Sequence, residues 1–411
     1  MAGEAENSSR NLNMYSNLKI NDLNDEKVKM NIGVIVFISV LMILGLFGNS
    51  NTIFIYLKKY KPSNYRTFIL CLAIVDLATC CLSMPFSLII LRFPLMFPYD
   101  EMCKGFTFLT FSMCTGSTLI LVTIATDRYR KICVPHGAQL SIQMAKYICI
   151  LDLLLASVFS WPCIVLFGNK HYETPMHNMS GIGCYYSDEF WNTSYPAKYN
   201  YFLLSILFVT FVALLVIYGL IGKQILHINR KRHPNKEMQL SLQKDTRKLY
   251  TNKNYRPSES QGNVVSQYDV NEKTEVSVYF TSLYDLTDIK ERQSPCKPYQ
   301  TLIPQKEDDS PTRSTLKRRR SNTVILILLI MTIISFISFL PNLFLTIIAL
   351  ERKDFLPNLS FTEMAAYQIF SWSFYINNVT FPIIYGFCDT KFIEETRKLY
   401  RLCVLLCFRR R

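Results

Sequence analysis

The sequence lacks the short motifs on which many enzymes depend. It contains no glycine-rich loop for binding phosphate and no cluster of metal-ligating residues at a plausible spacing. We therefore expect that the protein is not an enzyme, holds no resident metal and needs no cofactor for catalysis.

Charge is scarce within long apolar stretches. Half of the 411 residues are hydrophobic, mean hydropathy is +0.15, and the apolar residues are gathered into runs. A helix of about 20 apolar residues crosses about 30 Å of hydrocarbon. Seven runs reach that length: Ile32–Leu57, Thr67–Leu91, Met102–Ile132, Met144–Phe167, Tyr201–Leu226, Thr323–Leu350 and Met364–Phe387. These predict an all-α membrane protein, a bundle of seven transmembrane helices with a short amphipathic helix after the seventh.

The transporter or channel class is a distant alternative. Its usual marks are inverted repeats, broken helices or several facing charges within the membrane. No internal repeat is visible, and Asp76 is the clear acidic residue in mid-membrane.

The loops between the apolar runs predict an orientation. Basic residues gather after the first, third, fifth and seventh runs, which places those loops on the cytoplasmic side. The net charge of +14 is then explained by basic loops that lie next to anionic lipid, and it does not indicate binding to nucleic acid. We expect a plasma-membrane protein with its N-terminus outside, its C-terminus inside and no cleaved signal peptide.

The predicted topology divides the chain into five parts. Residues 1–31 form an extracellular tail, 32–226 hold five membrane helices, and 227–320 form a long, mostly disordered third cytoplasmic loop. Residues 321–387 hold the last two membrane helices, and 388–411 form a cytoplasmic amphipathic helix and a basic tail.

Cysteine residues and glycosylation signals are sorted by this topology. Cys103 and Cys184 are the two thiols on the predicted outside, so a disulfide is expected, with two free thiols as the alternative. Cys403 and Cys407 are either palmitoylation sites or plain apolar anchors. Asn-X-Ser/Thr signals on the predicted outside begin at Asn7, Asn178, Asn192 and Asn358.

Polar and helix-bending residues inside the apolar runs follow a recognisable order. They are Gly48-Asn49, Leu72-Ala73-Ile74-Val75-Asp76, Asp127-Arg128-Tyr129, Trp161, Tyr218, Phe339-Leu340-Pro341, Asn377, Asn378 and Phe381-Pro382-Ile383-Ile384-Tyr385. In this order, from about Ile32 to Cys407, the chain resembles the rhodopsin-like G-protein-coupled receptors. The resemblance implies an extracellular ligand, a heterotrimeric G protein as partner, and regulation by receptor kinases and arrestin.

The resemblance also implies an activation switch. Asp127 can hold Arg128 by a charge-assisted bond until activation releases the arginine toward Tyr218 and the G protein. Pro341 and Pro382 remove backbone donors and bend their helices. The switch residues are then Asp127, Arg128, Tyr129, Tyr218, Phe339, Pro341, Pro382 and Tyr385.

A buried polar core is the second implied site. An acid in mid-membrane is costly unless it has partners. By resemblance the partners of Asp76 are Asn49, Ser117 and Asn377 or Asn378, and an allosteric sodium ion can join them. The alternative is a protonated, hydrogen-bonded carboxyl group without an ion.

Several positions depart from the family pattern. Phe339 and Phe381 replace the usual tryptophan and asparagine, and Thr210 replaces a proline. Ser321 replaces the acidic residue that pairs with the arginine in some relatives. These changes weaken the expected sodium site and predict measurable basal signalling.

The ligand class is narrowed by what is missing. Thr110 occupies the position of the carboxylate that binds amines, and the seventh run has no lysine for retinal. If the family geometry holds, the pocket is lined by Thr110, Phe111, Cys114, Phe339, Asn342, Gln368, Trp372 and Tyr375. This aromatic and neutral-polar set favours a neuropeptide, although each ring could instead serve packing. The alternatives are a lipid, another non-amine small molecule, or no ligand.

Overall fold

The computed structural model describes residues 2–173, 180–251 and 313–409, with side chains described within 19–173, 180–228 and 325–401. The chain forms two units, Met1–Arg230 with Arg313–Arg411, and Lys231–Thr312. The first unit is a helical bundle. In the second, the described part is the continuation of helix α8 to Thr251, so most of the predicted loop 227–320 lies outside the described residues.

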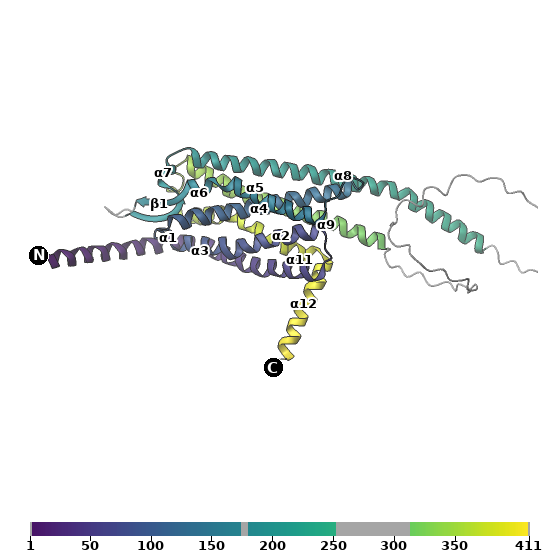
Figure 1. The fold of residues 1–411 in the computed structure, drawn as a ribbon, viewed down its shortest axis with the longest axis horizontal. Helices are drawn as coiled ribbons and strands as arrows, with labels where there is room; N and C mark the ends of the chain where they lie inside the picture. The colour runs from purple at the N-terminus through teal and green to yellow at the C-terminus, as the bar shows by residue number, and fades with distance from the viewer. Residues whose placement is uncertain (1, 174–179, 252–312, 410–411) are drawn as a thin grey trace, which may run out of the picture. The chain divides into compact units, whose positions relative to one another are not determined.

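Helices dominate the described chain, and one antiparallel hairpin lies at the end of the bundle where α7 begins (Figure 1). The elements are α1 (Ala2–Lys59), α2 (Asn64–Ala78), η1 (Thr79–Ser83), α3 (Met84–Arg92), α4 (Asp100–Cys133), α5 (Ile142–Ser160), α6 (Pro162–Leu166), β1 (Phe167–Glu173), β2 (Ser180–Tyr186), α7 (Asp188–Trp191), α8 (Tyr195–Thr251), α9 (Arg313–Glu351), α10 (Phe361–Ser371), η2 (Ser373–Ile376), α11 (Asn377–Cys388) and α12 (Thr390–Arg409). The predicted tail, residues 1–31, is helical from Ala2 onward.

Six stretches among the described residues are long and apolar enough to cross a membrane. They are Lys19–Lys59, Asn64–Arg92, Asp100–Cys133, Ile142–Leu166, Tyr195–Ile228 and Ile325–Glu351. The most apolar window is 56% buried in Asn64–Arg92 and 50% in Asp100–Cys133, but 22% in Tyr195–Ile228. The second and third predicted helices are therefore the most enclosed by protein, and the fifth presents most of its apolar surface outward, as a lipid-facing helix does.

The seventh predicted helix is not continuous. The expected run Met364–Phe387 is divided into α10, the 3₁₀ turn η2 and α11. The amide of Tyr375 bonds to the carbonyl of Trp372 at 3.3 Å. The hydroxyl of Ser373 bonds to the carbonyls of Phe370 and Ser338, each at 2.7 Å. These bonds offer the backbone an alternative to the α-helical ladder.

The second predicted helix contains a π turn, η1, which ends two residues before Pro85. Proline has no N–H group, and its ring crowds the carbonyl four residues earlier. The wider turn relieves that crowding. The break lies next to a polar cluster around Asp76.

Candidate functional site

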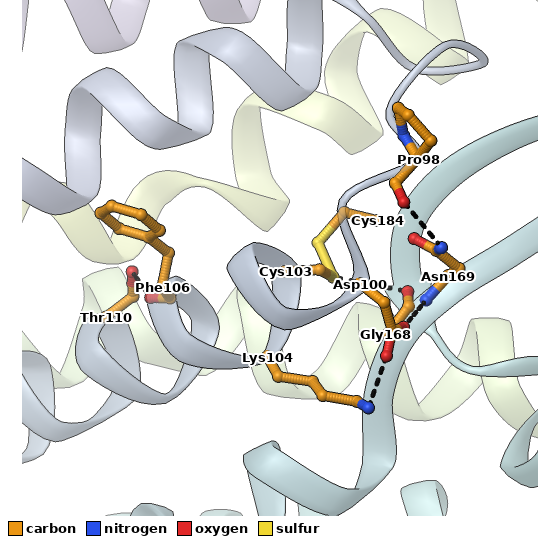
Figure 2. The surroundings of a disulfide bond; sticks show 9 residues. All are labelled: Pro98, Asp100, Cys103, Lys104, Phe106, Thr110, Gly168, Asn169 and Cys184. Atoms are coloured by element: carbon orange, nitrogen blue, oxygen red, sulfur yellow. Dashed lines mark hydrogen bonds and ion pairs between the residues drawn. A yellow bond between two sulfur atoms is a disulfide. The ribbon is translucent and has the colours of Figure 1, made fainter.

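A disulfide fastens the hairpin to the first turn of α4. It joins Cys103 and Cys184, whose Cα atoms lie 5.5 Å apart, and it confirms the predicted pairing (Figure 2). Nearby, the backbone amide of Asn169 donates to the Asp100 carboxylate at 2.7 Å. A β-carbon at Gly168 would lie 2.6 Å from the same carboxylate, so glycine is required for this close approach.

The second strand also pairs with the loop that precedes α4. The amide of Phe97 donates to the carbonyl of Ile182 at 2.8 Å, and the amide of Ile182 donates to the carbonyl of Leu95 at 2.9 Å. The hairpin is thus held on both sides of β2, by its partner strand and by this loop. It forms a firm wall over one end of the bundle.

The outer part of α1 is tied to the same loop. The side chain of Asn24 donates to the carbonyl of Arg92 at 3.2 Å and accepts from the amide of Leu95 at 3.3 Å. Asn31 donates to the carbonyl of Leu91 at 3.1 Å. Because these bonds satisfy backbone groups at the end of α3 and in the loop after it, they fix the turns of α1 from Asn24 to Asn31 against that end.

A cavity of about 600 Å³ lies beneath this wall. That volume is within the usual range for ligand sites. Five of the predicted pocket residues line it: Thr110, Phe111, Asn342, Gln368 and Trp372. Aromatic side chains from the hairpin and α7 also line it, namely Phe167, Tyr172, Tyr185, Tyr186 and Trp191. The sequence did not indicate these hairpin contributions, because two strands of seven residues that contain glycine show no clear apolar periodicity.

A smaller cavity of about 80 Å³ lies deeper in the bundle. Cys114 and Phe339 line it, together with Thr110, Phe111 and Asn342 from the larger cavity. Of the predicted pocket residues, Tyr375 lines neither cavity. It is fully buried, and its hydroxyl lies 2.7 Å from that of Ser87, so it serves helix packing instead.

Charge at the hairpin is largely paired. The ammonium of Lys170 lies 3.3 Å from Asp188 and 4.3 Å from the centre of the Trp191 ring. Burial would raise the pKa of Asp188, but hydrogen bonds from His171 and the attraction of Lys170 outweigh it and leave that pKa below its usual value. Burial also lowers the pKa of Lys170, against the opposing effect of Asp188.

A polar network surrounds Asp76 in the middle of the bundle. Its Oδ1 accepts from the Ser117 hydroxyl at 2.7 Å and from the Asn378 side chain at 2.9 Å. Asn49 does not bond Asp76 itself but donates to the backbone carbonyl of Asn378 at 3.0 Å. Asn377 accepts a hydrogen bond from Ser335. The carboxyl group of Asp76 thereby links α2 to α4 and to α11.

The Asp127–Arg128 pair lies at the other end of α4. The guanidinium Nη2 is 3.2 Å from the Asp127 carboxylate, which also binds Lys131 at 3.0 Å. The guanidinium lies 4.2 Å from the centre of the Tyr65 ring, a cation–π distance. Its buried Nε has no hydrogen-bond partner among the described residues. Arg128 is thus held by one ion pair and one ring contact, and one of its N–H groups is left unpaired in the described structure.

The other predicted switch residues lie on α8, α9 and α11. The hydroxyl of Tyr218 accepts from Thr332 at 3.4 Å. Tyr385 is fully buried beside Phe381, with ring centres 4.3 Å apart, and its hydroxyl is unpartnered in the described structure. Pro341 and Pro382 lie inside α9 and α11, and Tyr129 is half-buried on α4.

Asp152 is a second acid within an apolar helix, and it was not among the predicted site residues. It lies on α5, is mostly buried, and accepts from the Thr123 hydroxyl at 2.9 Å. The signal was present, since an acidic residue stands within an apolar run. This bond joins α4 to α5.

The predicted modification sites fall partly within the described chain. Asn192 and Asn358 are exposed, as glycan acceptors must be. Asn178 lies outside the described residues, as do the side chains of Asn7, Cys403, Cys407 and Ser321.

Residues 48–385 match the family model described as 7 transmembrane receptor (rhodopsin family). The chain belongs to this family.

Three curated relatives are receptors named for peptide or protein ligands. The mouse (Mus musculus) neuropeptide Y receptor type 6 is 29% identical over 42% of this chain and 47% of its own length. The Oncorhynchus mykiss C3a anaphylatoxin chemotactic receptor is 33% identical over 32% and 36%. The Xenopus laevis cholecystokinin receptor is 27% identical over 46% and 42%. This rhodopsin-family chain thus spans about half or less of the length of these relatives.

The family assignment agrees with the membrane-spanning helices and the cavity described above. This rhodopsin-family protein is a multi-pass membrane protein of a receptor family, with a hairpin-walled cavity at one end of the bundle and the Asp127–Arg128 ion pair at the other end of α4.

Proposed function

We propose that this protein is a plasma-membrane receptor for an extracellular peptide and that it activates heterotrimeric G proteins. Its N-terminus would lie outside and its C-terminus inside the cell. The observation that carries the proposal is the cavity of about 600 Å³, lined by aromatic and neutral-polar side chains beneath the hairpin. The relatives named for peptide ligands support the same ligand class.

The mechanism is a shift between two arrangements of α9. Asn342 lines both cavities and Phe339 lines the smaller one, and the two residues flank Pro341, so a peptide that reaches both cavities contacts the helix where it bends. A peptide that binds better when the opposite end of α9 swings outward increases the population of that form. The swing opens the space beside Arg128.

Arg128 then exchanges its partners. In the closed form its guanidinium is held by Asp127 and the face of Tyr65. In the open form the arginine would turn toward Tyr218, whose hydroxyl is held in the closed form by one 3.4 Å bond from Thr332. The freed surface would receive the G protein, and phosphorylation by receptor kinases would later recruit arrestin.

An allosteric sodium ion is part of this proposal. The residues around Asp76 fit such an ion, because the side-chain oxygens of Asn49 and Asn378 are buried and accept no hydrogen bond from the described residues. Asp76, Ser117 and these amide oxygens would hold the ion, which prefers hard oxygen ligands. Phe381 adds no oxygen there, so the ion would be weakly held.

The first test is a peptide-library screen on cells that express this chain with a promiscuous G protein, with calcium as the readout. We expect a saturable response that Arg128→Ala abolishes at unchanged surface expression. Lys146→Ala, an exposed basic residue on α5, is the matched control and should keep the response.

The screen also tests the alternatives. A library that gives no response at confirmed surface expression would contradict the peptide ligand and favour a lipid or another non-amine small molecule. A peptide response that survives Arg128→Ala would contradict the proposed switch.

A further inference from the structure

The charged side chains that line the outer cavity are all of one sign in the described part of the chain. They are Lys27 from α1, Lys170 from β1 and Lys353 from the segment after α9. The remaining described lining residues are aromatic, aliphatic or neutral-polar. A cavity with this balance attracts negative charge into an apolar site.

Two of the three lysines have no acidic partner within the described residues. Lys170 is paired with Asp188. Lys27 instead lies over the ring of Tyr172, with its ammonium 4.8 Å from the ring centre. Lys353 donates to the neutral side chain of Asn192. The site therefore carries two cations whose charge the described protein does not neutralise.

Two nearby acids bind other groups. Glu351, two residues before Lys353, accepts from the hydroxyl of Tyr201 at 2.7 Å. Asp25, two residues before Lys27, pairs with Arg92 at 2.9 Å. Since these two acids bind other groups, they do not neutralise Lys27 or Lys353.

The position of Lys27 is fixed by the fold. The bonds of Asn24 and Asn31 to the end of α3 hold the intervening turn of α1 against the hairpin. Lys27 and Lys353 come from separate elements, and both are exposed where they line the cavity. Each lysine therefore lies in the cavity lining, where a ligand can reach it.

Neutral donors and acceptors lie deeper. Gln368 is half-buried, and its side chain makes no hydrogen bond within the described structure. A free amide of this kind suits the backbone of a peptide, which has both donors and acceptors. This favours a peptide over a lipid, whose chains have neither.

On the basis of the proposed function, we propose that the ligand is an anionic peptide, in which an acidic side chain or a free terminal carboxylate binds Lys27 and Lys353 while adjacent apolar residues fill the aromatic cavity.

A direct binding selection tests this without signalling. The purified full-length receptor would be used to select from a randomised heptapeptide library made with both free and amidated C-termini, and the bound peptides would be sequenced by mass spectrometry. We expect enrichment of Asp, Glu or free termini on the wild type. Peptides so selected should bind about threefold or more weakly to Lys27→Gln or Lys353→Gln, and about tenfold or more weakly to the double variant.

Lys198→Gln is the matched control, because Lys198 is an exposed lysine on α8 that does not line the cavity. It should bind as the wild type does. Selected peptides with no acidic enrichment, or an equal loss in all lysine variants, would overturn the inference. A parallel arm with oleoyl lysophosphatidate tests the lipid source, and lysine-dependent binding of that lipid without any selected peptide would also overturn it. Acidic peptides that bind but do not signal would support this inference and contradict the proposed function.

Discussion

Asp76 and Asp152 are two acids in the membrane-spanning helices with different surroundings. Asp76 has an asparagine and a serine as donors, with two unpartnered amide oxygens nearby, whereas Asp152 has the single hydroxyl of Thr123. Oxygen-rich surroundings suit a cation, and a single hydroxyl does not. The two residues should therefore respond differently to sodium.

We predict that sodium stabilises the purified receptor through Asp76. Replacing potassium by sodium at equal ionic strength should raise the Tm of the wild type, because the ion binds the folded state. Asp76→Asn should remove the sodium effect, and Asp152→Asn should retain it. If sodium did not change the Tm of the wild type, the result would favour the alternative in which Asp76 is protonated and binds no ion.

For single residues, the sequence predicted the chemical type of the surroundings better than the individual contacts. The mid-membrane position of Asp76 was enough to expect polar partners, and Ser117 and Asn378 are among them. Tyr375 was expected in the pocket but packs on Ser87, because it lies in the 3₁₀ turn η2, which rotates its residues relative to a continuous α-helix. The sequence contains no signal for such a rotation.

At the scale of elements, the hairpin depends on its disulfide. Cys103→Ser should lower the free energy of unfolding by about 2–5 kcal/mol, because the bond closes a long loop in the unfolded chain. Thermal denaturation of the purified receptor checks this. Cys81→Ser, at an exposed free cysteine, should have little effect. Equal Tm values for the two variants would contradict the structural role of the bond.

The outer turns of α1 depend on two asparagine side chains. Asn24→Ala and Asn31→Ala should each leave a backbone group at the end of α3 without its partner, at a cost of about 1–2 kcal/mol. Hydrogen exchange should then become faster over residues 19–31 and 91–97. Asn21→Ala, at an exposed position on the same helix, should leave exchange unchanged. No difference between these variants would show that α1 is held by other contacts.

The length of the apolar runs was enough to predict helices, but it did not predict the irregular turns within them. All seven apolar runs are helical, because lipid forces the backbone to satisfy its own hydrogen bonds. The π turn before Pro85 and the 3₁₀ turn at Ser373–Ile376 depend on local side-chain bonds and ring crowding. The hairpin forms by pairing with residues distant in the sequence, and its two short strands show no clear apolar periodicity.

At the scale of the whole molecule, the orientation in the membrane stays a prediction from loop charge. We expect glycans at the exposed Asn192 and Asn358, so that Asn192→Gln and Asn358→Gln each increase gel mobility in receptor expressed in animal cells. Thr380→Val removes the signal that begins at the buried Asn378 and should leave mobility unchanged. Modification at Asn378 alone would contradict the topology.

The bonds that hold α1 to the end of α3 bear on how receptors of this kind are recombined. A chimera that exchanges everything before the first apolar residue, Ile32, would leave the membrane core intact yet remove Lys27, Met30 and Asn31 from the cavity lining. If its ligand preference changed, the cause would be the loss of these lining residues. A junction placed before Asn24 keeps them with the α3 end to which they are bonded.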